Sequence, residues 1–448
     1  MNTSVRNLSL IKRYIIFFTY LMIPLSIIGP GFIILPKIGP ITLLPHWLFM
    51  TVSIPASFFL LMINGFKIRL VSVVRIDKYI KFLLLWIVFG YISLLWASNR
   101  ELGLRDMVLF SLLIGYIILI MFSWSSLGNV KIAMALLYFI LIVNFCVVFV
   151  EIMYDYHLPA AGISITGMAM ERPSDYEPGL NVIFMKGVAS GTFYNANGLS
   201  IFVSIVLPII FSFYVRSPVQ KMYLRILSFI VVVIGIVLLF YTFTRTVYFA
   251  LFCAVIYYVL ISRNRKVIIL IFLSAIILFH RSLVTNIYEL VFNISQFDQS
   301  AELRAMFAKT VINDLFASFL LLGKGPAAYP FAIHNWYLEI AGLFGVYIFA
   351  LYIIFIFAIL KNLYAIYKKT HSVELRYLSE GLLGSNITYS ISCIADSGRL
   401  IGYDSWIIIA ASLVIINLYR SGNDKTNDSI AICGSGKNRG PCLKLGVV

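Results

Sequence analysis

Long apolar runs are the feature of this sequence that most restricts its fold. Residues 226–242 and 338–360 approach or exceed the roughly 20 residues that an α-helix needs to cross a hydrocarbon core of about 30 Å. Spanning β-strands would alternate between polar and apolar residues, and these runs do not alternate. The chain is 61% hydrophobic and only 12% charged, whereas soluble domains carry about 25% charged residues. The sequence therefore predicts an all-α integral membrane protein.

Windows of that length predict about twelve transmembrane helices in one polytopic domain, residues 1–420. The last residues, 421–448, are predicted to form a disordered cytoplasmic tail. The count depends on the ninth span, which is short, and on the eleventh, which Asn386 and Asp396 interrupt. The predicted spans are residues 14–35, 41–64, 79–97, 107–123, 132–151, 199–215, 226–243, 246–261, 267–280, 337–360, 383–398 and 403–419.

The distribution of basic residues predicts the orientation of the chain. With the amino end in the cytoplasm, 24 of the 35 Lys and Arg residues fall in segments predicted to be cytoplasmic. Basic residues stay on that side because anionic lipid and the membrane potential oppose their export. Both termini are therefore predicted to be cytoplasmic. Contact with anionic lipid also accounts for the net charge of +16, so no nucleic-acid partner is expected.

Two segments on the predicted outer face are long, about 152–198 and about 281–335. Loops of this length are usually functional or disordered. In the second loop, apolar residues recur at helical spacing and predict an amphipathic helix at the membrane surface. Arg304 and Lys309 lie off this apolar stripe, which comprises Leu303, Met306, Phe307, Val311 and Leu315.

Polar strings at the predicted outer face resemble conserved motifs of the O-antigen ligase and polymerase family. They are GTFYNANGLS at 191–200, FTRT at 243–246, Arg304 followed by LGKG at 322–325, and HNWYLEIAGLFG at 334–345. The resemblance covers roughly residues 185–360, and the amino-terminal spans match only in number and hydropathy. The chain departs from the pattern where Ala196 replaces a common proline and where Lys186 stands near the arginine of some members.

The resemblance implies an activity and a role for several residues. Members of the family transfer or polymerise sugars carried on undecaprenyl diphosphate at the outer face of the bacterial cytoplasmic membrane, without a metal or a nucleotide cofactor. By this likeness, Arg245 holds the donor diphosphate, Arg304 supplies a second cation, and His334 activates the acceptor hydroxyl. The expected partners are the lipid-linked oligosaccharide, membrane lipid, a flippase and a chain-length regulator.

The chemistry of these residue types agrees with such roles. Glycosyl transfer from a lipid diphosphate leaves negative charge on a phosphate oxygen, and fixed cations stabilise that charge. The planar fork of arginine can contact two phosphate oxygens and stays charged. A neutral imidazole accepts a proton near neutral pH. The polar residues expected to bind the substrate are Lys186, Asn195, Asn197, Asn335 and Glu339.

Each of these residues also has a simpler interpretation. An arginine at a span end often extends toward lipid headgroups, which would account for Arg245, and Arg304 on a surface helix would contact lipid or solvent. His334 beside Trp336 would belong to an interfacial aromatic belt. Asn195 or Asn197 would cap the following helix. The first outer loop holds three candidate alternative bases, whose simpler interpretation is a solvated loop face: Glu171, Asp175 and Glu177.

Polymerisation is the function that we expect from the sequence. The abundance of Ile, Phe, Tyr and Lys favours an AT-rich genome, and in a bacterium without an outer membrane a lipid A acceptor would be absent. A ligase would use the same donor and differ only in its acceptor. A transporter or flippase also fits about twelve helices, but carriers place charges near the membrane midplane, whereas here the candidate charges cluster at the outer face.

Overall fold

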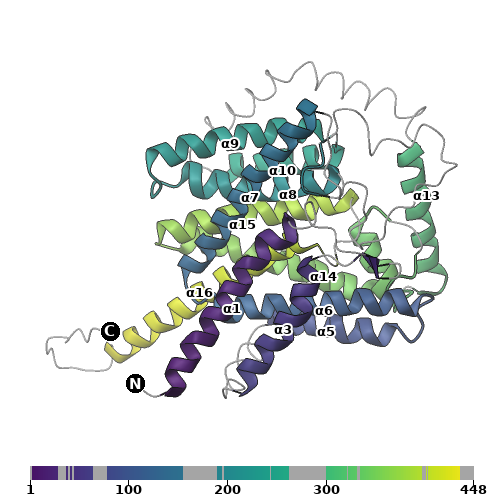
Figure 1. Ribbon diagram of the computed structural model, residues 1–448, viewed down its shortest axis with the longest axis horizontal. Coiled ribbons are helices and arrows are strands. Elements are labelled where there is room, and N and C mark those ends of the chain that lie inside the picture. Colours follow the sequence, from purple (N-terminus) through teal and green to yellow (C-terminus); the bar gives the residue numbers. More distant parts are fainter. Residues whose placement is uncertain are drawn as a thin grey trace.

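Long helices lying against one another make up the computed structural model (Figure 1). It describes residues 3–28, 37–38, 41–42, 45–63, 78–154, 189–193, 196–242, 244–261, 299–319, 321–329, 333–395, 400 and 402–433. A hairpin of two short strands, β1 (Lys37–Ile38) and β2 (Ile41–Thr42), pairs Lys37 with Thr42. The α-helices are α1 (Thr3–Ile27), α3 (Pro45–Ile63), α5 (Lys78–Ser93), α6 (Arg100–Ser123), α7 (Leu127–Tyr154), α8 (Ala196–Ile209), α9 (Met222–Tyr241), α10 (Arg245–Ile261), α13 (Gln299–Asp314), α14 (Trp336–Lys369), α15 (Val373–Ser392) and α16 (Tyr403–Cys433).

Three short helices extend the longer ones. A π-helix, η2 (Ile210–Arg216), continues α8, and a second π-helix, η3 (Leu315–Phe319), continues α13. One 3₁₀ turn, η4 (Cys393–Ala395), follows α15. A π-helical turn often marks a functional position.

The predicted helical class is confirmed, and the lengths and compositions of the helices are consistent with a membrane protein. Seven helices of the described part are long and apolar enough to cross a membrane, and α3 and α10 contain shorter apolar stretches. The predicted ninth span, 267–280, lies outside the described residues, so the number twelve stays a prediction. The seven are Leu10–Ile27, Arg100–Ser123, Leu127–Tyr154, Ala196–Arg216, Met222–Leu239, Trp336–Lys369 and Tyr403–Ser421.

Helix α6 connects two opposite ends of the bundle. Beyond its last residue, Ser125 accepts a hydrogen bond from Lys12 Nζ at 2.8 Å, close to the start of α1. Before its first residue, Trp96 Nε1 donates to the Gly323 carbonyl at 3.0 Å. We call this second end the site end; it holds the 94–99 turn, residues 321–329 and the first part of α14. The start of α1 and the last part of α16 lie on the same side in Figure 1.

The most polar long helix, α15, packs against α8, α10, α14 and α16. Glu380 is fully buried and pairs with Arg216 at the end of η2, and Asn386 Nδ2 donates to Ser412 Oγ at 2.9 Å. The helix begins at Val373, ten residues before the predicted span 383–398, and ends at Ser392. The predicted boundary was wrong because Glu380 looks solvent-exposed in the sequence, while its partner Arg216 is distant along the chain.

Helix α16 continues to Cys433. It therefore passes residue 420, where the sequence places the end of the membrane domain, and enters the predicted tail, 421–448. The remaining tail residues, 434–448, lie outside the described part of the chain, and their disorder stays a prediction.

A cluster of buried aromatic rings holds the start of α14 in place. The Trp86 ring centroid on α5 lies 5.0 Å from that of Phe110, 5.7 Å from that of Phe344 and 6.4 Å from that of Trp336. Trp406 on α16 completes the cluster at 6.5 Å. Aromatic pairs of this kind contribute about 0.5–1.5 kcal/mol each beyond their buried area. The rings thus join α5, α6, α14 and α16 close to the residues that precede α14.

Candidate functional site

Two polar side chains of α7 anchor the segment before α8. The carboxylate of Glu151 accepts hydrogen bonds from Ser190 N, Ser190 Oγ and Gly191 N at 3.0, 2.8 and 2.7 Å. Asn144 Oδ1 accepts from Thr192 N and Thr192 Oγ1, both at 3.0 Å. All five residues are buried. A buried carboxylate is tolerated in this position because several donors satisfy it.

A hydrogen bond joins the starts of α8 and α10. Thr244 Oγ1 donates to Asn197 Oδ1 at 3.0 Å, which ties the string at 191–200 to the string at 243–246. Arg245 is the first residue of α10, so its backbone starts next to this contact, although its side chain is outside the described part. Lys186 and Asn195 also lie outside the described residues, as do the alternative bases Glu171, Asp175 and Glu177.

The LGKG string packs directly on the backbone of α14. Lys324 N donates to the Gly342 carbonyl at 2.8 Å, and Gly325 N donates to the Leu343 carbonyl at 2.9 Å. Helix α14 is kinked at Gly345, which has φ 77° and ψ 173°. A side chain there would overlap the Leu321 carbonyl oxygen. Only glycine adopts this backbone region readily, and only glycine leaves room for the loop.

An ion pair ties α13 to the same loop. Lys324 Nζ lies 2.6 Å from Asp314 Oδ2, and both side chains are about one-quarter exposed. The ammonium also lies 5.5 Å from the centroid of the Tyr329 ring. Burial, together with the nearby Asp314 carboxylate, raises the pKa of the Tyr329 phenol, which therefore stays protonated at neutral pH.

Arg304 lies on α13, and the structure confirms the predicted helix there. The helix stands across the direction of α5, α6 and α14 in Figure 1. It buries Val311, as the predicted stripe requires, against a small cluster that includes Ile333 and Ala341. Arg304 itself is half-buried, and its Nε is a buried atom without a hydrogen-bond partner among the described residues. A purely solvent-facing arginine would not have this buried donor.

His334 has a left-handed backbone immediately before α14. Its φ is 53°, and such a conformation costs a non-glycine residue about 1–2 kcal/mol. The next residue, Asn335, caps the helix because its Oδ1 accepts from Leu338 N at 3.0 Å. Trp336 is fully buried and donates to Tyr352 Oη at 3.1 Å, so it is not part of an interfacial aromatic belt. Glu339 follows within the first turn and is half-buried.

These contacts join the sequence motifs in two pairs. The 191–200 string meets the 243–246 string, and the 322–325 string meets the 334–345 string. Helix α15 packs against α8, α10 and α14, the helices that follow three of these strings. Strained backbone of the kind seen at His334 is concentrated at functional sites in proteins. The first pair brings together an amide and a hydroxyl group at the starts of α8 and α10, and the second lies beside the strained backbone of His334.

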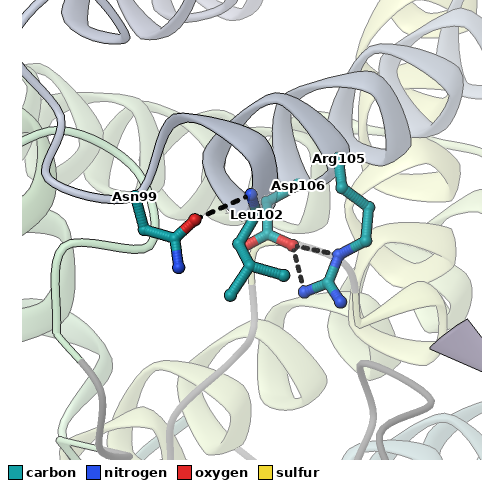
Figure 2. Close-up of polar contacts among 4 residues, drawn as sticks. All are labelled: Asn99, Leu102, Arg105 and Asp106. Atoms are coloured by element: carbon teal, nitrogen blue, oxygen red, sulfur yellow. Dashed lines mark hydrogen bonds and ion pairs between the residues drawn. The ribbon is translucent and has the colours of Figure 1, made fainter. Parts of the chain in front are cut away.

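Sequence reasoning did not single out Arg105 and Asp106, one turn into α6 (Figure 2). Arg105 Nη2 lies 2.8 Å from Asp106 Oδ1, and the two side chains are only 13% and 21% exposed. The sequence does show two adjacent residues of opposite charge next to an apolar run. That pattern by itself is typical of an ordinary helix start.

The chain matches no protein-family model. It is similar to the teichuronic acid biosynthesis protein TuaE of Bacillus subtilis (strain 168), with 20% identity over 367 residues. The similarity covers 76% of this chain and 71% of that protein, so it extends beyond residues 185–360.

Proposed function

We propose that this protein is a membrane glycosyltransferase that polymerises undecaprenyl-diphosphate-linked oligosaccharide repeat units at the outer face of the bacterial cytoplasmic membrane. The observation that carries the proposal is the pairing of polar strings at helix starts of an apolar bundle, together with a buried arginine donor and a strained histidine. The similarity to TuaE supports the broader assignment to synthesis of a cell-surface polysaccharide.

The proposed reaction needs no redox change. The acceptor hydroxyl oxygen forms a bond to the anomeric carbon of the donor, while the bond from that carbon to the diphosphate oxygen breaks. The hydroxyl proton moves to the imidazole of His334, and the lipid diphosphate leaves with the bonding electrons. Arg245 and Arg304 stabilise the charge on the departing diphosphate, an effect that commonly contributes about 2.7–4 kcal/mol.

The other residues have supporting roles in this proposal. Lys186 and Asn195 contribute to the binding of phosphate or sugar hydroxyls, as the sequence motif suggests. Asn197 orients the start of α10 through Thr244, and Asn335 orients the start of α14 through its cap. Glu339, in the first turn of α14, is assigned a supporting contact with the histidine or the acceptor.

The experiment that tests this proposal uses the purified full-length protein in detergent with undecaprenyl-diphosphate-linked repeat units, followed by sizing of the glycan. A polymerase lengthens the glycan and releases undecaprenyl diphosphate. A ligase consumes the same donor only when a different acceptor is added. A transporter consumes nothing in detergent, where there is no second compartment, so an unchanged donor would refute the enzymatic proposal.

The roles of single residues are tested with matched controls. Arg304→Ala and His334→Ala should abolish long glycan while the protein remains in the membrane. Lys309→Ala on the exposed surface of the same helix and His371→Ala in the exposed α14–α15 turn should leave the glycan length unchanged. Normal chains from both site variants would contradict the assignment.

A further inference from the structure

Arg105 is a mostly buried cation at the site end that belongs to none of the four motifs. Its Nε and Nη2 donate to Asp106 Oδ1 at 3.1 and 2.8 Å, so one carboxylate oxygen takes both N–H groups (Figure 2). The third guanidinium nitrogen, Nη1, is a buried atom without a hydrogen-bond partner among the described residues. A buried, unsatisfied donor on a charged group is costly, and such an atom calls for an explanation such as a missing ligand.

The first turns of α6 are held firmly beside the loop that precedes His334. Asn99 caps the helix by accepting from Leu102 N at 3.1 Å (Figure 2). Gly103 packs so closely on this loop that an added Cβ would lie 2.9 Å from the Pro326 carbonyl oxygen. The Ser98 hydroxyl donates to the Ala328 carbonyl at 3.4 Å. Arg105 therefore projects from a helix that is tied to the candidate site.

The neighbouring basic residue, Arg100, provides a contrast on the same helix. Its side chain is exposed, and its Nη2 donates to the Leu95 carbonyl at 2.9 Å. Arg100 thus has a local structural role at the start of α6. Arg105 instead has one nitrogen without a partner in the described part of the chain, while Asp106 fixes the orientation of the guanidinium.

We propose that Arg105 binds an oxyanion of the substrate through Nη1, with Asp106 as its positioning residue. This proposal rests on the proposed function for the nature of the substrate, a lipid-linked glycan. A guanidinium suits phosphate and carboxylate equally, because both present oxygens that match its planar fork. The diphosphate of the lipid carrier and the carboxylate of an acidic sugar are the two groups of this chemistry on such a substrate.

Binding measurements on the full-length protein in detergent distinguish the two sources. The phosphate arm compares undecaprenyl diphosphate with undecaprenol. The carboxylate arm compares an oligosaccharide of uronic acids with its carboxyl-reduced form. Arg105→Gln should weaken the binding of one anionic probe by about 10- to 100-fold, as expected for a lost hydrogen bond between charged groups. The binding of the matching neutral probe should not change.

Three further variants distinguish direct binding by Arg105 from a long-range effect of its charge and from a purely structural role of the Arg105–Asp106 ion pair. Arg100→Gln removes the same charge from the same helix and should change binding less than about twofold, since exposed charges are screened. Arg105→Lys keeps the charge without the planar fork and should lose less affinity than Arg105→Gln. Asp106→Asn keeps an acceptor for Arg105 and removes a competing anion, so binding should be equal or tighter.

Equal losses in Arg105→Gln and Arg100→Gln, or unchanged binding of both anionic probes by Arg105→Gln, would overturn the proposal. If Arg105→Gln does not fold, weaker binding by a folded Asp106→Asn protein would overturn it as well. Binding requires no turnover, so the outcome is independent of the polymerisation assay. Arg105-dependent binding without any glycan product would refute the enzymatic activity and leave the oxyanion site in place.

Discussion

The kink of α14 at Gly345 allows a sharp test of how the site is built. Gly345→Ala would place a Cβ 2.8 Å from Leu322 N and in overlap with the Leu321 carbonyl oxygen. Real Cβ atoms do not approach backbone this closely, so the 321–325 segment must move. This segment leads toward His334, and its displacement should therefore disturb the candidate site as well as the fold.

The expected loss of stability follows from two contributions. The backbone at φ 77° and ψ 173° lies in a region that only glycine populates readily, which costs another residue about 1–3 kcal/mol. Movement of the segment also breaks the bonds from Lys324 N to Gly342 O and from Gly325 N to Leu343 O, each worth about 1 kcal/mol. We expect Gly345→Ala to lower the free energy of unfolding by about 3–5 kcal/mol.

The measurement combines unfolding by SDS titration with sizing of the glycan product. Gly345→Ala should unfold at lower SDS and form glycan about 100-fold more slowly, because displacements of about 1 Å near reacting groups have such effects. Gly128→Ala at the start of α7 is the matched control, since its nearest atom would be Ser126 Oγ at 3.5 Å. A Gly345→Ala protein as stable and active as the parent would refute the reasoning.

Three other substitutions test separate contacts. His334→Gly should be about 1 kcal/mol more stable than His334→Ala, because φ at this position is 53°. Neither variant should form polymer. A higher thermal unfolding temperature for the alanine variant than for the glycine variant would contradict the expected order of stability. Asn197→Ala and Thr244→Val each remove one side of a 3.0 Å hydrogen bond, and a double-mutant cycle should give a coupling of about 1 kcal/mol, whereas zero coupling would exclude the contact. Glu151→Ala leaves three donors without their acceptor and should lower the free energy of unfolding by about 3 kcal/mol or more. Glu151→Gln keeps one acceptor oxygen and should lower it less. Equal losses of stability in SDS titration would contradict this expectation.

Local hydropathy was sufficient to predict most of the helices. The run at 226–242 coincides with α9 up to Tyr241, the run at 338–360 lies within α14, and the periodic stripe in the second outer loop marks α13. These predictions succeed because a spanning helix satisfies its backbone within itself and needs only a long apolar segment. The start of α15 was not predictable in this way, since its burial depends on the pairing of Glu380 with Arg216.

The candidate site was predictable in part. The left-handed φ of His334 and the buried Nε of Arg304 involve residues that the motifs had already indicated. The use of Asn335 as a helix cap and the complete burial of Trp336 emerged only from the folded structure. A polar side chain next to a helix start has several uses, and the choice among them depends on which neighbours fold onto it.

The sequence by itself determined that this is a helical membrane protein, where most of its helices lie, and which polar strings adjoin them. Those properties depend on the length and polarity of continuous segments, which the bilayer selects without reference to the rest of the chain. Only the tertiary structure decided that the 322–325 string packs on the kink at Gly345, and that a buried nitrogen of Arg105 has no partner among the described residues. Such features arise because close packing brings together groups from distant segments, and their geometry has no counterpart in the local sequence.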